Sequence, residues 1–275
     1  MDTLRERAVD GRHIALYAES YEGSFNLDPP SRPLPEDFDR GRIMIQLFPI
    51  NRCYQHDMFD PACRELNRQY AWALDAWLKG PLGKQLIVGE YYNVSQYFDL
   101  AIGFSRVMDA DLKRYLRRGV YGVHYMHVPN AAWGTRTLTQ FQFARQLWNP
   151  AEDRRTIMRE YLRRRYGRQA PAADRQVRLR LKEDCFLLRY TSLTLDLFLA
   201  LARLWHAAKY GGRVGALYLQ IDRLGRQLAQ LELPAGSCWK TAQPALERIR
   251  MKEVLSVMRA KKPVLEALSR AAGRR

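Results

Sequence analysis

Polar and aromatic side chains gather at or just after the ends of four short apolar runs in the sequence. They are Glu19, Arg52, Tyr54, His56, Glu90, Tyr91, Tyr92, Asn93, His124 and Trp133. An aromatic ring can stack on the C–H face of a sugar, and planar polar groups bind sugar hydroxyls through paired hydrogen bonds. This mixture of carboxylates, amides, imidazoles and rings favours a carbohydrate site, and these residues are its candidates.

Glu90 and Glu19 are the candidate catalytic carboxylates. Glu90 has the strand parity of Leu86 and Val88, so we expect it on their face, at the mouth of the strand. There it is either a catalytic acid or hydroxyl ligand, or the ion-pair partner of Arg52. Glycoside hydrolysis needs two carboxyl groups about 5–9.5 Å apart. The sequence alone leaves the distance between Glu19 and Glu90 open.

The aromatic and basic candidates each have a structural alternative. Tyr91 and Tyr92 are adjacent in the chain, so they leave a strand on opposite faces and at most one lines a given pocket. Trp133 is interpreted as a sugar platform or lid rather than a core residue. Arg52 either supports the fold or holds a carboxylated or otherwise anionic sugar.

Metal and cofactor chemistry are not predicted. His124 and His127 lie three residues apart on or near a strand, so their side chains leave from opposite faces. The cysteines are widely spaced: Cys53, Cys63, Cys185 and Cys238. Without a C-x-x-C motif neither a zinc knuckle nor a redox pair is indicated, and we expect reduced, mostly buried thiols. Motifs of the G-x-S-x-G, H-E-x-x-H and Walker types are missing from the sequence.

The elements that position the candidates are four expected strands with helices between them. The strands are 13–18, 43–48, 85–90 and 120–126. Their near-continuous apolar runs are typical of a parallel α/β sheet covered on both faces. The carboxyl ends of such strands form the site in both a (β/α)₈ barrel and an open doubly wound sheet, and both architectures fit.

Two helices of this region have clear boundaries in the sequence. The first has Asp60 as N-cap, Pro61 as its first residue and Gly80 as its end. Its expected buried positions are Leu66, Tyr70, Ala73, Leu74 and Trp77. The second runs from about 109 to 118 and stops at Gly119. Its expected buried positions are Leu112, Tyr115 and Leu116.

The pattern becomes wholly helical from Thr135, so we divide the chain into 1–134, an α/β part, and 135–275, a helical part. One helix is expected to carry Phe141, Ala144, Leu147 and Trp148 on one apolar face. A helix capped by Asn149-Pro150 follows, carrying Ile157, Tyr161 and Leu162. Longer helices are expected at 174–208, 213–232 and 243–271.

Several motifs together carry a family resemblance. They are Arg52-Cys-Tyr-Gln-His56 through Cys63, Asn67 and Trp77, then Glu90-Tyr-Tyr-Asn93, Asp111-Leu112 with Tyr115 before Gly119-Val-Tyr-Gly122, and Phe143-Ala-Arg-Gln-Leu-Trp-Asn-Pro150 with Asp153, Tyr161 and Tyr166-Gly167. In this order they resemble a bacterial glycoside-hydrolase-like domain of unknown function, related in architecture to α-glucuronidases and β-hexosaminidases. The resemblance covers roughly residues 40–170.

The resemblance implies a (β/α)₈ barrel followed by helices that binds or hydrolyses a glycosidic substrate. Related hydrolases carry the general acid after the fourth strand, whereas the four strands here look like strands five to eight. The chain is therefore expected to be the C-terminal half of a barrel, completed by a missing N-terminal half or by a second copy. No catalytic residue transfers, and the matching positions are substrate contacts: Arg52, Tyr54, His56, Glu90, Tyr91, Tyr92 and His124.

Composition and charge leave two alternatives to a carbohydrate-active protein. Hydrophobic residues make up 47% of the 275 residues, enough for a core, and the net charge is +16. Such a charge permits binding of nucleic acid, but the arginines are spread along helices and no RNA-binding motif is present. The alternatives are thus a basic nucleic-acid-binding or scaffold protein and a structural half-barrel homodimer. The charged start and the lack of an apolar run of about 18 residues predict a cytoplasmic chain as written, with no membrane span.

Overall fold

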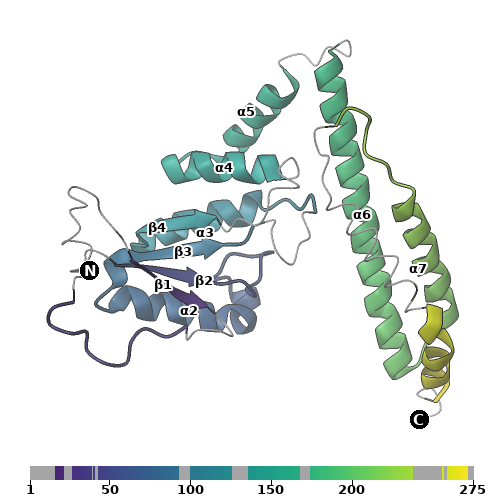
Figure 1. The fold of residues 1–275 in the computed structure, drawn as a ribbon, viewed down its shortest axis with the longest axis horizontal. Coiled ribbons are helices and arrows are strands. Elements are labelled where there is room, and N and C mark those ends of the chain that lie inside the picture. Colours follow the sequence, from purple (N-terminus) through teal and green to yellow (C-terminus); the bar gives the residue numbers. More distant parts are fainter. Residues whose placement is uncertain are drawn as a thin grey trace, which may run out of the picture. The chain divides into compact units, whose positions relative to one another are not determined.

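Four parallel strands form one sheet in sequential order, β1-β2-β3-β4 (Figure 1). The strands are β1 (Leu16–Tyr21), β2 (Ile43–Phe48), β3 (Leu86–Glu90) and β4 (Gly122–Tyr125). The computed structural model describes residues 16–21, 27–38, 40, 43–92, 100–125, 136–167, 174–237, 256 and 259–271. A mixed α/β fold with a parallel sheet is confirmed. β2 has the predicted bounds, while β1 continues to Tyr21, three residues beyond its expected end at 18.

The helix after β2 starts with a short 3-10 turn that the sequence analysis merged into it. Pro61–Cys63 form the turn η2, and the Asp60 carboxylate accepts a hydrogen bond of 2.9 Å from the N–H of Ala62. The α-helix proper is α2 (Arg64–Lys79), and Gly80 caps its end as predicted. A second turn, η3 (Gly83–Gln85), leads directly into β3.

The next helix, α3 (Ser105–Arg118), begins four residues before the predicted start. It ends at Gly119, whose φ of 80° lies in the left-handed region that glycine adopts at low cost. Two predicted core positions were wrong, because Leu66 and Leu116 are 56% and 60% exposed. Polar Asn67 in α2 and Asp111 in α3 are buried instead.

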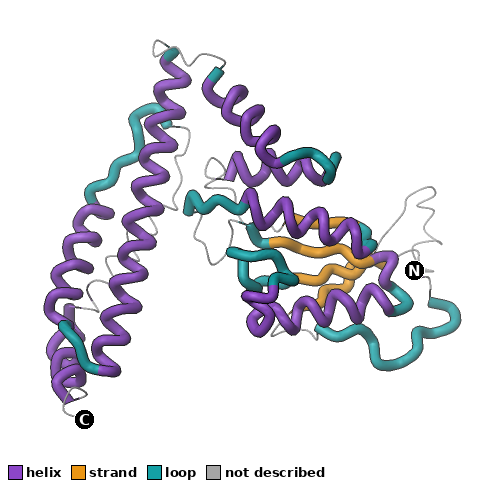
Figure 2. The backbone as a smooth tube through the Cα atoms, turned by 180° about the vertical axis from the view of Figure 1, so that it is seen from behind, coloured by secondary structure: helices purple, strands orange, loops and turns teal. Residues whose placement is uncertain are grey.

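One face of the sheet packs against both helices. Figure 2 shows α2 and α3 on the same side of the strands. The core between them joins alternate strand residues to helix residues: Ile45, Leu47, Leu86, Val88, Tyr70, Ala73, Leu74, Trp77 and Tyr115. The helices connecting consecutive strands thus cover a single face.

The opposite face of the sheet carries Phe48, Ile87, Gly89 and His124, by strand parity and register. The ring of Phe48 lies so close to β3 that a Cβ at Gly89 would collide with it. The same ring contacts the His124 ring edge-on at 6.3 Å between centroids. Glycine at position 89 therefore lets an aromatic ring cross the strand.

The chain divides into two units that interleave in sequence. The first is Met1–Ser95, Gly103–Val128 and Thr139–Met158, and the second is Gln96–Ile102, Pro129–Leu138 and Arg159–Arg275. The first unit, which holds the sheet, thus continues beyond the expected boundary at residue 134. It includes most of α4 (Thr137–Trp148) and the start of α5 (Arg154–Tyr166).

The buried face of α4 is polar, which makes the predicted face wrong. Its buried residues are Thr139, Gln142, Phe143 and Gln146, whereas Leu147 and Trp148 are 42% and 92% exposed. Gln142 Nε2 donates to the carbonyl of Ser105 at 2.8 Å, and Gln146 Nε2 donates to Asp109 at 2.5 Å. These amides tie α4 to α3.

The second unit is built on α6 (Arg175–Tyr210) and α7 (Val214–Ala229), with a further helix over 259–271. Asp174 caps α6 by accepting from the N–H groups of Gln176 and Val177. Leu197, Leu204, Ile221 and Leu224 are among the residues of its core. The expected long helices are confirmed over their described residues, except that α7 ends at Ala229, three residues before the expected end at 232.

α6 is long and apolar enough to cross a membrane, which the sequence analysis did not predict. Its most apolar window has a mean hydropathy of 1.5, and 39% of that window is buried within the structure. Core helices of soluble proteins have the same length and composition, and α6 packs one side against α7.

Candidate functional site

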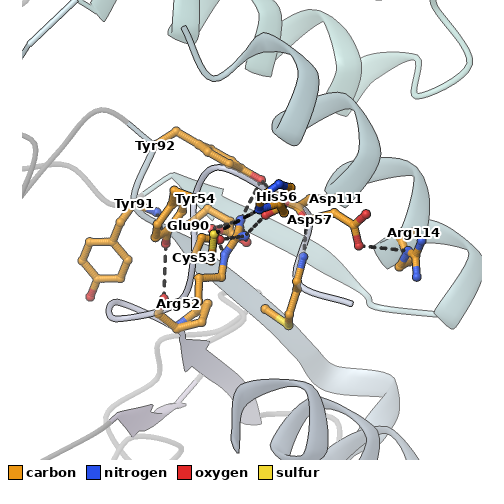
Figure 3. A network of polar contacts seen from close by, with 12 residues as sticks. Arg52, Cys53, Tyr54, His56, Asp57, Glu90, Tyr91, Tyr92, Asp111 and Arg114 are labelled. Carbon is orange, nitrogen blue, oxygen red and sulfur yellow. Dashed lines mark hydrogen bonds and ion pairs between the residues drawn. The ribbon is translucent and has the colours of Figure 1, made fainter. Parts of the chain in front are cut away.

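A buried ionic network lies at the carboxyl ends of β2 and β3 (Figure 3). Arg52, just after β2, places its guanidinium between Glu90, the last residue of β3, and Asp111 of α3. Arg52 Nη2 lies 3.0 Å from Glu90 Oε2 and 2.5 Å from Asp111 Oδ2. All three side chains are completely buried. Glu90 is therefore the ion-pair partner of Arg52, one of the two roles considered for it.

Three tyrosines enclose the network. The hydroxyl of Tyr92 donates to Asp111 Oδ2 at 2.8 Å, and that of Tyr115 donates to Glu90 Oε1. The Arg52 guanidinium lies over the ring of Tyr54, 4.1 Å from its centroid. Burial raises the pKa of each of these tyrosines well above its usual value. The phenols therefore remain protonated donors at neutral pH.

The same guanidinium fixes the loop that follows β2. Arg52 Nη1 donates to the carbonyls of Cys53 at 3.0 Å and of His56 at 3.4 Å. From α2, Asn67 Oδ1 accepts a hydrogen bond of 2.7 Å from the Cys53 N–H. The N–H of Met58 donates to Asp111 Oδ1 at 3.0 Å. The buried Arg52 and Asp111 side chains thus hold the backbone of this loop through hydrogen bonds.

The loop after β2 and the turn η2 together carry a cluster of two thiols and an imidazole. His56 Nδ1 lies 3.6 Å from Cys53 Sγ and 3.1 Å from Cys63 Sγ. The three atoms all lie within 4.8 Å of one another, and each residue is partly exposed. The expectation of mostly buried thiols was wrong for the described cysteines, since Cys185 is also exposed.

The two thiols of this cluster are electrostatically unequal. Burial raises the pKa of Cys53, but hydrogen bonds from Cys63 and His56 outweigh it, so that this pKa lies below its usual value. The hydrogen bond with Cys53, together with burial, raises the pKa of Cys63 to about 11. Cys53 is therefore the thiol that ionises first.

The sequence analysis missed this cluster, although a signal was present. The spacing C-x2-H-x6-C runs across Pro61 at the start of a helix, and the search for C-x-x-C did not cover it. Whether the thiols come together depends on the fold of the loop. That fold is set by Arg52, which Glu90 and Asp111 hold, and by Asn67, and these contacts join residues distant in the sequence.

Two further predicted site residues, Tyr91 and His124, lie outside both the buried network and the thiol cluster. Tyr91 is 4% exposed, its N–H donates to the Tyr54 hydroxyl at 3.1 Å, and its ring lies edge-on to Phe48. His124 is exposed on β4. Asn93, His127, Trp133 and Cys238 lie outside the described residues.

The register of the strands bears on Glu19 and Glu90 as a catalytic pair. Position 19 is beside Gln46 in β2, and Gln46 is beside Ile87 in β3. Glu90 lies three positions beyond Ile87. Strand positions an odd number apart belong to opposite faces of a sheet. By backbone register positions 19 and 90 therefore fall on opposite faces of the sheet, and the pairing of these two carboxylates stays a prediction.

A family model matches residues 28–178, more than half of the chain. The chain belongs to the DUF4838 family, a domain of unknown function. The DUF4838 segment includes β2 to β4, the buried network and the thiol cluster, and it ends within α6. No curated protein and no solved structure matches the chain.

Within the DUF4838 segment, the buried network and the exposed groups differ in what they can do. The carboxylates of Glu90 and Asp111 are occupied by Arg52 and by tyrosine hydroxyls, so the network acts as a structural support. The partly exposed cluster of Cys53, His56 and Cys63 has the donor atoms of a metal site. His124 offers an exposed imidazole beside an aromatic ring.

The network contains two carboxylates and one guanidinium. This excess of carboxylates affects the pKa of Asp111. Burial raises the pKa of Asp111, Arg52 lowers it and Glu90 raises it again, with a result of about 6. In the unfolded chain an aspartate titrates near about 3.9. The folded state therefore binds this proton more tightly than the unfolded chain. The stability that the proton contributes is complete below about pH 3.9 and is lost as pH rises through about 6.

We therefore expect one aspartate of the folded DUF4838 chain to titrate near pH 6. The measurement is NMR of ¹³C-labelled aspartate carboxyls between about pH 3 and 8, a range that spans both values. The resonance with this midpoint should vanish in Asp111→Asn. If every aspartate titrates below about pH 5, within the usual range, the assignment is wrong.

Proposed function

We propose that this DUF4838 chain is a carbohydrate-binding, glycoside-hydrolase-like protein whose sheet is half of a (β/α)₈-type barrel. The proposal is carried by the sequential parallel order β1-β2-β3-β4 with α2 and α3 on one face. In a doubly wound sheet the strand order reverses and helices cover both faces. In a (β/α)₈ barrel the order is sequential and the helices lie outside. The described elements have the barrel's pattern.

In such a barrel the face carrying Phe48, Gly89 and His124 lines the interior. Active sites of these barrels lie at the carboxyl ends of the strands. At that end the Phe48 ring contacts both Tyr91 and His124, and His124 is exposed. The Phe48 and Tyr91 rings are buried and support the exposed imidazole, which offers a hydrogen-bonding group to a sugar. His124 is the proposed sugar contact.

The proposal concerns binding, with hydrolysis depending on a carboxylate from outside the network. Glu90 and Asp111 are fully buried and paired. Among the described strands β1 and β4 are edges, each with a single neighbour. Unpaired edges favour completion by further strands. A second half, from a longer polypeptide or a second copy, would pair these edges and could supply the acid. Light scattering of the purified chain distinguishes a dimer from a monomer.

The nucleic-acid alternative has weaker support, since several arginines of the described residues pair with carboxylates or are buried. The ion pairs are Arg118–Asp75, Arg145–Glu152, Arg165–Asp184, Arg226–Asp222 and Arg259–Asp222. Arg52 and Arg136 are buried. These contacts engage several of the arginines with carboxylates, and the sequence holds no RNA-binding motif, so we favour the carbohydrate function.

The test is calorimetric titration of the chain with uronic-acid and amino-sugar oligosaccharides. We expect binding of one of these classes. We also expect His124→Ala to weaken it about tenfold or more, because a hydrogen bond is worth about 0.5–1.5 kcal/mol and a ring contact adds to it. Tyr121→Ala is the matched control. Tyr121 is 68% exposed and directly precedes β4, so it lies at the amino end of that strand, away from the proposed site.

Two results would argue against carbohydrate binding. The first is that the chain, alone and in any longer protein that contains it, binds neither class of oligosaccharide. The second is that His124→Ala and Tyr121→Ala change the affinity equally, which would place the sugar away from the carboxyl end of the sheet.

A further inference from the structure

We propose that Cys53, His56 and Cys63 form a zinc-type metal site with three protein ligands and a fourth position open to solvent. The site is distinct from the proposed sugar contact. It joins the loop after β2, which supplies Cys53 and His56, to the start of α2, where Cys63 ends the turn η2.

The distances between the donor atoms match those around a tetrahedral ion. Zinc bonds of about 2.3 Å to sulfur and about 2.0–2.1 Å to nitrogen place neighbouring sulfur and nitrogen ligands about 3.6 Å apart. His56 Nδ1 lies 3.6 Å from Cys53 Sγ and 3.1 Å from Cys63 Sγ. A rotation of the partly exposed Cys63 side chain closes the remaining difference. With the three ligand atoms within 4.8 Å of one another, side-chain rotations of this size bring them around one ion.

The donor set selects the class of metal. Two thiolates and an imidazole are soft and borderline ligands, which favour zinc and similar ions over calcium or magnesium. Two thiolates with a neutral imidazole also balance the charge of a divalent ion. Since all three residues are partly exposed, water can occupy the fourth position.

The ligands are held in place by contacts that do not depend on the metal. Arg52 Nη1 donates to the carbonyls of both Cys53 and His56, which fixes the backbone of two ligands. Asn67 Oδ1 accepts from the Cys53 N–H. Such outer contacts orient metal ligands and are part of a built site.

The third ligand is fixed by the cap of its own turn. The Asp60 carboxylate accepts from the Ala62 N–H, and Pro61 presets the first residue of the turn. Cys63 is thereby presented at the end of η2, next to the first residue of α2.

Metal titration of the full chain tests the site. The protein is reduced, freed of metal with a chelator, and titrated with Zn²⁺ or Co²⁺. We expect one equivalent to bind, and bound Co²⁺ to show a thiolate charge-transfer band and the intense visible absorption of tetrahedral coordination. We also expect bound Zn²⁺ to raise the melting temperature, because the ion binds the folded chain preferentially.

Variants separate this site from other thiols of the chain. Cys53→Ser, His56→Ala and Cys63→Ser should each weaken binding by more than about 100-fold, since losing an outer contact alone costs about 10–100-fold. His56→Cys should restore binding with a changed Co²⁺ spectrum, which guards against misfolding as the cause. Cys185→Ser is the matched control, because Cys185 is an exposed thiol outside the cluster, and its variant should bind like the unmodified chain.

Three outcomes would overturn the proposal. The first is uptake of well under one equivalent by the reduced, folded chain. The second is equal loss of binding in Cys185→Ser and Cys63→Ser. The third is a Cys53–Cys63 disulfide in the isolated protein that, once reduced, leaves thiols unable to bind either ion.

Discussion

Replacing Arg52 with methionine is expected to lower the free energy of unfolding by about 3–5 kcal/mol, the usual cost of removing one member of a buried charge network. Methionine keeps much of the volume but leaves Glu90 and Asp111 buried without their cation. The carbonyls of Cys53 and His56 lose their donor as well. Urea denaturation at pH 7, followed by circular dichroism, measures the change.

Arg118→Met provides the control for this substitution. Arg118 pairs with Asp75, and both side chains are partly exposed, so its loss should cost no more than about 1 kcal/mol. Equal destabilisation by the two variants would show that the buried network does not support the fold. Because Arg52 also orients two ligands of the proposed metal site, Arg52→Met should bind Zn²⁺ about 10–100-fold more weakly where it stays folded.

The local elements of the sheet were predictable because their signals are local. The run Ile43–Phe48 is apolar except for Gln46 and forms β2 with the predicted bounds. Gly80 and Gly119 end their helices as expected, since a glycine after the last turn is a direct stop signal. The strand parity of Glu90 was also correct, because it places the carboxylate on the face of Leu86 and Val88.

The partners of Arg52 were only partly predictable. Glu90 was considered as a partner, but Asp111 was not, and it lies 59 residues away on a helix. Periodicity grouped Leu116 with Leu112 and Tyr115, yet Leu116 is 60% exposed while Asp111 is buried. The burial of Asp111 follows from the position of Arg52, which no periodicity in α3 encodes.

The buried face of α4 illustrates the same limit. Hydrophobic periodicity favoured Leu147 and Trp148, yet the structure buries Gln142 and Gln146. These amides are buried at low cost because they bond to Ser105 and Asp109 of α3. A pattern of apolar residues cannot identify a polar interface whose partners come from another helix.

The second large effect is expected at Gly83, in the turn that directs the chain from α2 into β3. A Cβ at this position would lie 2.7 Å from the carbonyl carbon and 2.9 Å from the Cα of Leu78. These are backbone atoms in the last turn of α2, so the clash cannot be relieved by rotating a side chain. We expect Gly83→Ala to cost about 3 kcal/mol, the upper end of the usual range for overpacking.

Gly103→Ala is the control, because a Cβ there meets nothing within 4 Å, and it should change stability by less than about 0.5 kcal/mol. Denaturant unfolding of both variants gives the comparison. The turn also sets where β3 begins at Leu86, and hence where Glu90 meets Arg52. A folded Gly83→Ala chain should therefore show a displaced Asp111 titration, whereas an unchanged midpoint together with wild-type stability would mean that Gly83 does not position the strand.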